Sequence, residues 1–211
     1  MSNESPRPDA PWPEDLDPLV KATRGLQPWR RIFHMVSGLA MALLPALLGW
    51  TRAGTLGVLF VLLVIAVGLD VQRLRRPEWN RTFFQVLRPL VSAREAVGIA
   101  SSTWYLVGGL LTYLLFPPIY AILAILVLAV ADPAAAVVGQ NLGGRRIGTG
   151  SVSGTTTFFL VATVILWTGT GSPVAAVVAL AVALLETVPT GIDDNLVIPL
   201  STGILLTLLV G

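Results

Sequence analysis

The stretch GTLGVLFVLLVIAVGLDV, residues 54–71, indicates what kind of protein this chain forms. Its side chains are small or apolar almost throughout, and its one charged residue, Asp70, lies near its end. A helix of about 20 such residues crosses the roughly 30 Å hydrocarbon core of a bilayer, because each residue adds about 1.5 Å. Residues 54–71 are therefore predicted to form a membrane-spanning helix.

Comparable apolar stretches lie on both sides of this one. The chain of 211 residues is 54% hydrophobic and 12% charged, with a mean hydropathy of +0.76. A water-soluble domain of this length could hardly cover so much apolar surface with polar side chains. We therefore expect an all-α, polytopic integral membrane bundle of about seven transmembrane helices. The predicted spans are 32–50, 54–71, 97–116, 118–138, 152–169, 173–188 and 195–211.

Lysine and arginine predict the orientation, because they accumulate in cytosolic loops. They cluster before the first span, in the 72–96 loop and in the 140–151 loop, whereas the alternate loops hold only Arg52. The N-terminus and the polar loops are thus expected on the cytosolic side of a bacterial-type plasma membrane. Residues 1–29 are predicted to be a cytosolic polar tail, partly disordered, and residues 30–211 the transmembrane domain.

Composition excludes several kinds of site. There is no cysteine, so disulfides, thiolate metal sites and cysteine nucleophiles are excluded, and a single histidine, His34, excludes a histidine-rich metal site. The net charge is only +2, so the chain lacks the strong positive charge that nucleic-acid binding requires. Nucleic acid is therefore not expected as a partner. Chemistry has to come from carboxylates, amides, hydroxyls, arginines and backbone N–H groups.

The least lipid-like part of the apolar region is ADPAAAVVGQNLGGRR, residues 131–146. An ionised Asp132 beside the membrane is costly without a partner, which makes it a candidate functional residue. The glycines allow backbone N–H groups to approach phosphate oxygens, and the arginines add positive charge. The alternative is a glycine-rich turn whose arginines obey the positive-inside rule. The residues concerned are Gly139, Gly143, Gly144, Arg145 and Arg146.

Two further clusters are predicted at the same membrane face. Ser151, Gly154 and Thr155 open a helix, whose N-terminus is either an anion site or an ordinary capped and closely packed helix end. The second cluster could bind a divalent cation through its oxygen atoms, or form a solvated turn. Its members are Glu186, Asp193, Asp194 and Asn195.

The 70–105 region is rich in arginine and amphipathic. Such a segment beside a bilayer is expected to lie along anionic headgroups, which accounts for most of its charge. Arg94 and Glu95 are the exception, because they enter a predicted span. His34 is more often a hydrogen-bonded packing residue than a catalyst at such a position.

Taken together, these motifs resemble the CTP-dependent lipid-alcohol kinases, which comprise dolichol kinase, phytol kinase and the yeast-type diacylglycerol kinase. These enzymes are distant relatives of the phosphatidate cytidylyltransferases. The similarity runs from about Arg30 to the C-terminus and rests on the order and spacing of the motifs. The matching residues are Arg31, His34, Gly38, Asp70, Arg73, Arg94, Glu95, Gly98, Tyr105, Asp132, Pro133, Ala134, Gly139, Gly143, Ser151, Gly154, Thr155, Glu186, Asp194, Asn195 and Pro199.

The resemblance implies phosphoryl transfer from a nucleoside triphosphate, with CTP expected, to the hydroxyl of a membrane lipid such as a polyprenol, a phytol-like alcohol or diacylglycerol. Asp132, Glu186 and Asp194 are the expected catalytic residues, and with Asn195 they are the expected ligands of Mg²⁺ or another divalent cation. The expected nucleotide-binding residues are Gly139, Gly143, Gly144, Arg145, Arg146, Ser151, Gly154 and Thr155.

One position departs from the family pattern. The family usually has Lys-Ser before its Gly-Ser/Thr pair, whereas this chain has Gly150 at the lysine position. Arg145 or Arg146 could supply the missing charge, although a rigid guanidinium is no simple substitute for a movable ammonium. The alternatives are a different nucleotide pose, a different phosphate donor or a member that has lost the activity.

Two other functions stay open at this stage. A cytidylyltransferase acting on a lipid phosphate is consistent with the distant kinship. A non-catalytic membrane protein that binds or moves a lipid or small solute could use the same charged cavity for recognition. The oligomeric state is open too, because the small residues in these helices could pack within one bundle or between two.

Overall fold

The computed structural model describes residue 12, residues 16–23 and residues 27–211, and it is nearly all-α as the sequence predicts. A two-stranded hairpin, β1 (Arg146–Ile147) and β2 (Gly150–Ser151), joins two of the helices. The helices are α1 (Asp17–Lys21), α2 (Pro28–Leu47), α3 (Arg52–Arg75), α4 (Pro77–Val86), η2 (Ala93–Ala96), α5 (Ser101–Leu115), α6 (Pro118–Leu126), η3 (Val127–Ala131), α7 (Asp132–Leu142), α8 (Val152–Thr170), α9 (Ala175–Glu186) and α10 (Asp194–Leu209).

Each of the seven predicted spans contains a helix. Three helical stretches in the described part of the chain are long and apolar enough to cross a membrane, namely Arg52–Arg75, Pro118–Leu142 and Val152–Thr170, and α9 and α10 are shorter apolar helices. The structure therefore supports a membrane protein. Seven crossings and a cytosolic N-terminus remain predictions.

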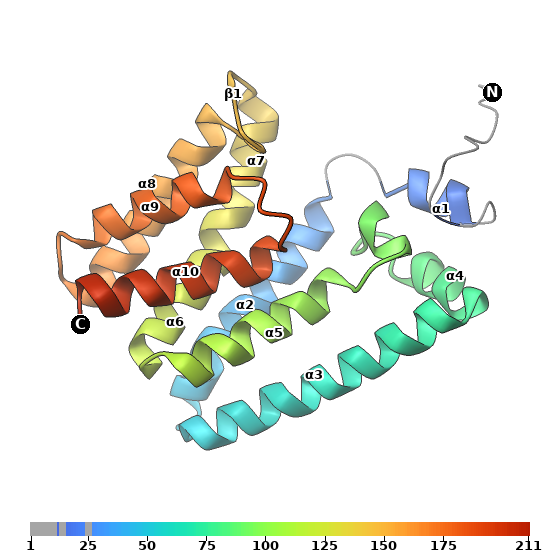
Figure 1. Ribbon diagram of the computed structural model, residues 1–211, viewed down its shortest axis with the longest axis horizontal. Helices are drawn as coiled ribbons and strands as arrows, with labels where there is room; N and C mark the ends of the chain where they lie inside the picture. Colours follow the sequence, from blue (N-terminus) through green and yellow to red (C-terminus); the bar gives the residue numbers. More distant parts are fainter. Residues whose placement is uncertain (1–11, 13–15, 24–26) are drawn as a thin grey trace.

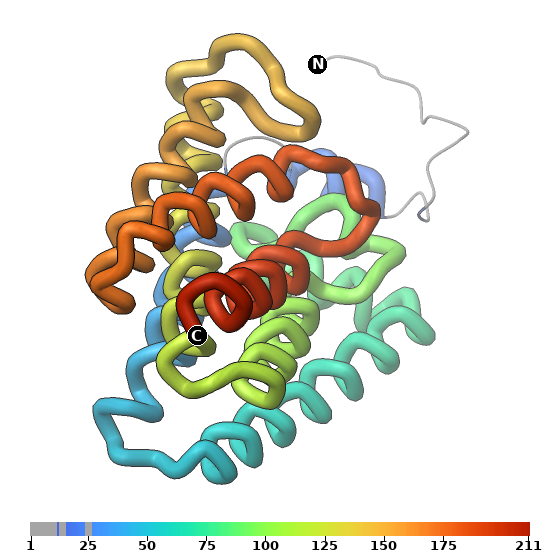
Figure 2. The backbone as a smooth tube through the Cα atoms, turned by 60° about the vertical axis from the view of Figure 1, so that its left-hand side comes forward, coloured from blue at the N-terminus to red at the C-terminus, as the bar shows by residue number. Residues whose placement is uncertain are grey.

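The main core lies where α6, η3 and α7 pack against α8, α9 and α10 (Figure 1). Phe158, Val178 and Ile198 are among its fully buried side chains. Figure 2 shows α10 beside α5, and α3 packs against α5 at the edge of the molecule. The outer face of α3 exposes apolar side chains such as Val61 and Val64, as a lipid-facing helix does.

The helix that carries Asp132 changes its hydrogen-bond pattern just before that residue. Residues 127–131 form the π-helical segment η3 between α6 and α7. Pro133 has no N–H to donate, so the regular bond to the carbonyl of Ala129 cannot form there. A π segment is the local adjustment that such an interruption allows, and such segments are frequent at functional sites.

A smaller core forms between α1, α4 and η2. Leu16 and Val20 are buried there against Phe84, Val91 and Ala96. The described part of the predicted polar tail therefore packs on the domain, and the 72–96 loop contains a helix. The disorder predicted for the tail falls mainly on 1–11, 13–15 and 24–26, which lie outside the described residues.

A buried polar network joins the end of α3 to the start of α5. The Asp70 carboxylate accepts hydrogen bonds from Arg73 Nε at 2.6 Å, Ala100 N at 3.0 Å and Thr103 Oγ1 at 2.7 Å. Arg73 also donates to Asn80 Oδ1 and to the carbonyl oxygens of residues 95 and 98. Every charge in this network is paired, so we assign it a structural role.

Candidate functional site

The hairpin, the end of α7 and the start of α8 enclose a cavity of about 550 Å³, here called the glycine pocket. All but one of the residues predicted to bind a nucleotide line it. The exception is Arg145, which precedes β1, whereas Arg146 within β1 lines the cavity. The predicted residues that line it are Gly139, Gly143, Gly144, Arg146, Ser151, Gly154 and Thr155, and Gly150 and Glu186 also do so.

The glycines of this pocket serve different purposes. Gly143 and Gly144 have φ values of +61° and +110°, so they turn the chain out of α7 in conformations that other residues rarely adopt. Gly139 and Gly154 let α7 approach α8, because a Cβ on Gly139 would lie 2.8 Å from Ser151 Oγ and 3.4 Å from Gly154 Cα. For these last two, close helix packing accounts for the residue choice.

Hydrogen bonds hold the hairpin against the end of α9. Thr149 N donates to Thr187 O at 3.0 Å, and Thr149 Oγ1 donates to Glu186 O at 3.1 Å. Ser151 caps α8 by accepting from Gly154 N, and Ser153 Oγ donates to Gly143 O at 2.6 Å. These bonds fix Glu186 beside the glycine pocket.

Gly148 makes that contact possible, and we expect Gly148→Ala to disrupt it. Gly148 has a φ of +53°, and a Cβ there would lie 1.8 Å from Thr187 O. The hairpin must therefore move away from α9 and shift Glu186. The midpoint of thermal unfolding of the purified protein should therefore be lower than in the wild type, because the bonds of Thr149 to the end of α9 are lost. Gly171→Ala, a second positive-φ glycine with open space around it, is the matched control. Equal effects of both substitutions would contradict this role.

The three predicted catalytic carboxylates line one cavity of about 340 Å³, here called the carboxylate pocket. Asp132 comes from α7, Glu186 from the end of α9 and Asp194 from the start of α10. Glu186, Gln140 and Ala136 also line the glycine pocket, so the two cavities adjoin. The other predicted residues found here are Arg31, His34, Arg94, Pro133, Asp193 and Asn195, and Arg30 and Gln27 also line the cavity.

Opposite charges balance within the carboxylate pocket. The carboxylates of Asp194 and Glu186 repel that of Asp132, whereas Arg31 and Arg30 attract it. Glu186 lines the same pocket from the last position of α9. Four acids and three arginines line the pocket, so its charges nearly cancel, and both a cation and an anion would meet opposite charges there.

Unsatisfied polar atoms mark both pockets. Among the described residues, the buried side-chain atoms without a hydrogen-bond partner are Arg30 Nε, Arg31 Nη1, Thr155 Oγ1 and Tyr105 Oη. The first three belong to residues that line the carboxylate pocket or the glycine pocket. Because buried polar groups are normally paired, these atoms indicate a place for a polar ligand.

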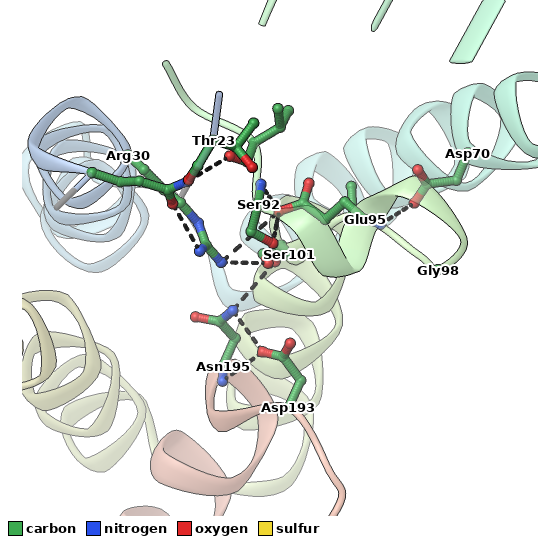
Figure 3. A network of polar contacts seen from close by, with 12 residues as sticks. Thr23, Arg30, Asp70, Ser92, Glu95, Gly98, Ser101, Asp193 and Asn195 are labelled. Atoms are coloured by element: carbon green, nitrogen blue, oxygen red, sulfur yellow. Dashed lines mark hydrogen bonds and ion pairs between the residues drawn. The ribbon is translucent and has the colours of Figure 1, made fainter. Parts of the chain in front are cut away.

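A chain of hydrogen bonds, here called the wall, lies beside the carboxylate pocket (Figure 3), and its members Arg30, Asp193 and Asn195 line that pocket. Arg30 Nη2 donates to Ser101 Oγ at 2.7 Å, and Ser101 Oγ donates to Glu95 Oε1 at 3.2 Å. Asn195 Nδ2 donates to Asp193 Oδ1 at 2.7 Å. The wall ties α2, α5 and α10 together and thereby fixes Asp194, which follows Asp193 directly.

Divalent-cation ligands were predicted among these residues. No group of three or more His, Asp or Glu in the described part of the chain is arranged to hold a metal ion by itself. Mg²⁺ in nucleotide enzymes uses one or two carboxylates, with waters and substrate phosphates as its other ligands. The predicted ligands Asp132, Glu186, Asp194 and Asn195 all line the carboxylate pocket, and Mg²⁺ binding there stays a prediction.

Eight of the residues matched in sequence line neither pocket, namely Gly38, Asp70, Arg73, Glu95, Gly98, Tyr105, Ala134 and Pro199. Asp70 and Arg73 belong to the buried network at the start of α5 and reach neither pocket. Glu95 lies in the wall of Figure 3. Sequence reasoning missed Gln140, Thr149 and Arg30 as site residues. Arg30 could have been found, because it adjoins Arg31 at the start of a predicted span. Gln140 and Thr149 could not, because uncharged polar residues in a predicted loop do not indicate a site.

Comparisons with models of protein families, with curated proteins and with solved structures found no match to this chain.

Proposed function

We propose that this chain transfers the γ-phosphoryl group of a nucleoside triphosphate, CTP by preference, to the hydroxyl of a membrane lipid alcohol. The observation that carries the proposal is the meeting of the three carboxylates in one pocket that shares Glu186 with the glycine pocket. Catalysis of phosphoryl transfer is mainly positioning and charge stabilisation, which two adjoining polar pockets can supply.

The glycine pocket is the proposed site of the nucleotide. Its volume of about 550 Å³ lies within the range of small-molecule sites. Arg146 supplies positive charge, and the unpaired Thr155 Oγ1 supplies a donor for a phosphate oxygen. Gly143 and Gly144 leave their backbone accessible, because no atom lies where their Cβ would be.

The carboxylate pocket is the proposed site of transfer. Asp132 accepts the proton of the lipid hydroxyl as the hydroxyl oxygen forms its bond to the γ-phosphorus. The bond from that phosphorus to the bridging oxygen breaks, and the nucleoside diphosphate leaves. Arg31 stabilises the charge on the transferred group through its unpaired Nη1. Mg²⁺ held by Glu186, Asp194 and Asn195 would neutralise the phosphate oxygens.

A lysine at position 150 should improve nucleotide use. A Cβ on Gly150 would lie 3.6 Å from Thr155 Oγ1 and 3.7 Å from Glu186 Oε2, which are ordinary contact distances inside the glycine pocket. The ammonium of Gly150→Lys therefore adds a charge for the phosphates without steric cost. We expect the KM for CTP to fall several-fold. Gly150→Gln is the matched control, and inactivation by lysine in a folded protein would contradict the proposed pose.

A second function is favoured by one feature of the carboxylate pocket. Arg30, Arg31 and Arg94 line it together, and three guanidinium groups could bind a phosphate on the acceptor. An acceptor that already carries a phosphate would make the chain a lipid-phosphate cytidylyltransferase. That reaction releases pyrophosphate instead of a nucleoside diphosphate, so the products separate the two proposals.

A transfer assay tests the proposal. Purified protein is incubated with γ-labelled CTP or ATP, Mg²⁺ and a panel of farnesol, phytol and dioctanoylglycerol. Label in an extracted lipid supports the kinase proposal. The absence of labelled lipid with every donor and acceptor, from protein that unfolds cooperatively, would contradict it.

A further inference from the structure

We propose that a third cavity is the entrance and binding site for the lipid acceptor, an inference that rests on the kinase function proposed above. This cavity, here called the acceptor pocket, has a volume of about 620 Å³. It lies between the stretch from η2 to α5 and the loop that joins α9 to α10. The residues that line it include Ile99, Trp104, Val188, Ile192, Arg94 and Asp194.

The acceptor pocket has the apolar wall that the other two cavities lack. Glycines, hydroxyls and charged side chains line most of the glycine and carboxylate pockets. Here Trp104 is half-buried, and Ile99, Val188 and Ile192 are 45%, 52% and 56% exposed at the rim. Exposed apolar side chains at a membrane protein surface face lipid at little cost, so an alkyl chain can enter between them.

The acceptor pocket joins the carboxylate pocket at its polar end. Arg94, Asp193 and Asp194 line both cavities. The hydrogen-bonded wall of Figure 3 runs between them, with Ser101 and Glu95 on the acceptor side and Arg30 and Asn195 on the carboxylate side. A hydroxyl inserted past Trp104 would thus reach Asp194 first, while its chain stays between Ile99 and Ile192.

The nucleotide and the lipid would then approach from different sides. The glycine pocket adjoins the carboxylate pocket at Glu186 and the acceptor pocket adjoins it at Asp194. Transfer between two such substrates requires this geometry, because the donor phosphorus and the acceptor oxygen must meet at the carboxylates. The ligand chemistry assigned to the acceptor pocket is therefore an alcohol on a long apolar chain.

A second apolar groove is the natural comparison. It has a volume of about 390 Å³ and lies between α3, α4 and α5, with Trp79, Phe83 and Val86 among its lining residues. Its floor is the paired Asp70–Arg73 network, and none of the three carboxylates lines it. The groove could hold the alkyl chain of a lipid, but it has none of the three carboxylates that could react with the lipid hydroxyl. Substitutions in this groove therefore serve as controls.

Val188→Trp fills the acceptor pocket and tests the proposal. With farnesol as acceptor, we expect its KM to rise at least about tenfold while the KM for CTP stays within twofold, because the glycine pocket is untouched. Val86→Trp, in the comparison groove, should leave both constants unchanged. If Val188→Trp fails to fold, Ile192→Trp in the same loop is the replacement. An unchanged KM for farnesol, or an equal rise with Val86→Trp, would overturn the assignment.

Photolabelling separates this inference from the kinase proposal. A diazirine analogue of farnesol is activated on wild-type protein in nanodiscs, and the labelled peptides are identified by mass spectrometry. Label in 97–104 and 187–193 is the expected result. Phosphorylated farnesol with label only in the comparison groove would overturn the acceptor pocket alone. Failure to phosphorylate any alcohol would overturn the kinase proposal, whatever the peptides show.

Discussion

Asp132→Asn is expected to lower CTP-dependent phosphorylation of a lipid alcohol by about 10²–10⁴-fold, the usual contribution of a general base. The amide keeps the size of the side chain but cannot accept the proton of the hydroxyl. It also removes a negative charge that Arg31 and Arg30 attract in the carboxylate pocket. The measurement is the initial rate of label transfer from γ-labelled CTP, at saturating nucleotide and acceptor.

Glu186→Gln and Asp194→Asn should each abolish the same activity, because both carboxylates line the pocket from other helices. Glu78→Gln is the control, since Glu78 lies exposed near the start of α4 and lines none of the three pockets. All variants must show cooperative thermal unfolding. Wild-type turnover in any one of the three would remove that residue from the mechanism.

Asp70→Asn is expected to destabilise the protein by about 3–5 kcal/mol, the usual cost of breaking a buried ion pair. The substitution leaves the Arg73 guanidinium buried without its counterion, although Asn80 and two carbonyl oxygens still accept from it. The free energy of unfolding is measured by denaturant titration in mixed micelles, with Glu78→Gln as the exposed control.

The stability of the Asp70→Asn variant distinguishes a structural role of Asp70 and Arg73 from a catalytic one. Asp70 and Arg73 match the lipid-kinase pattern in sequence, but their contacts join α3 to η2 and α5. Small losses of stability, within about 0.5 kcal/mol of the control, combined with a large loss of activity would show that the pair acts in the chemistry.

The helices could be predicted because a continuous apolar stretch of the sequence indicates each of them. An apolar stretch such as 54–71 needs no partner to be recognised, and all seven predicted stretches contain a helix. The meeting of Asp132, Glu186 and Asp194 also followed from local signals. Each acid lies at the predicted cytosolic mouth of a span, so the orientation alone brought them to one end of the bundle.

Long-range contacts explain what could not be predicted. The hairpin divides the glycine pocket from the acceptor pocket through the bond from Thr149 to Thr187, residues far apart in sequence. A buried pair such as Asp70 and Arg73 resembles a catalytic pair in sequence until its partners in α5 are known. Similarly, Arg146 lines the glycine pocket while its neighbour Arg145, which precedes β1, does not, and no local pattern in the sequence distinguishes the two.

Parallel reactions with α-labelled and γ-labelled CTP test the central claim most directly. Purified protein in nanodiscs receives either nucleotide with Mg²⁺ and either farnesol or farnesyl phosphate, and both the lipid and the nucleotide products are separated. Transfer of the γ label alone to the lipid, with labelled CDP in the α series and no transfer by Asp132→Asn, is the predicted result. Label in the lipid from the α series with release of pyrophosphate, or labelled lipid in neither series, would contradict the account.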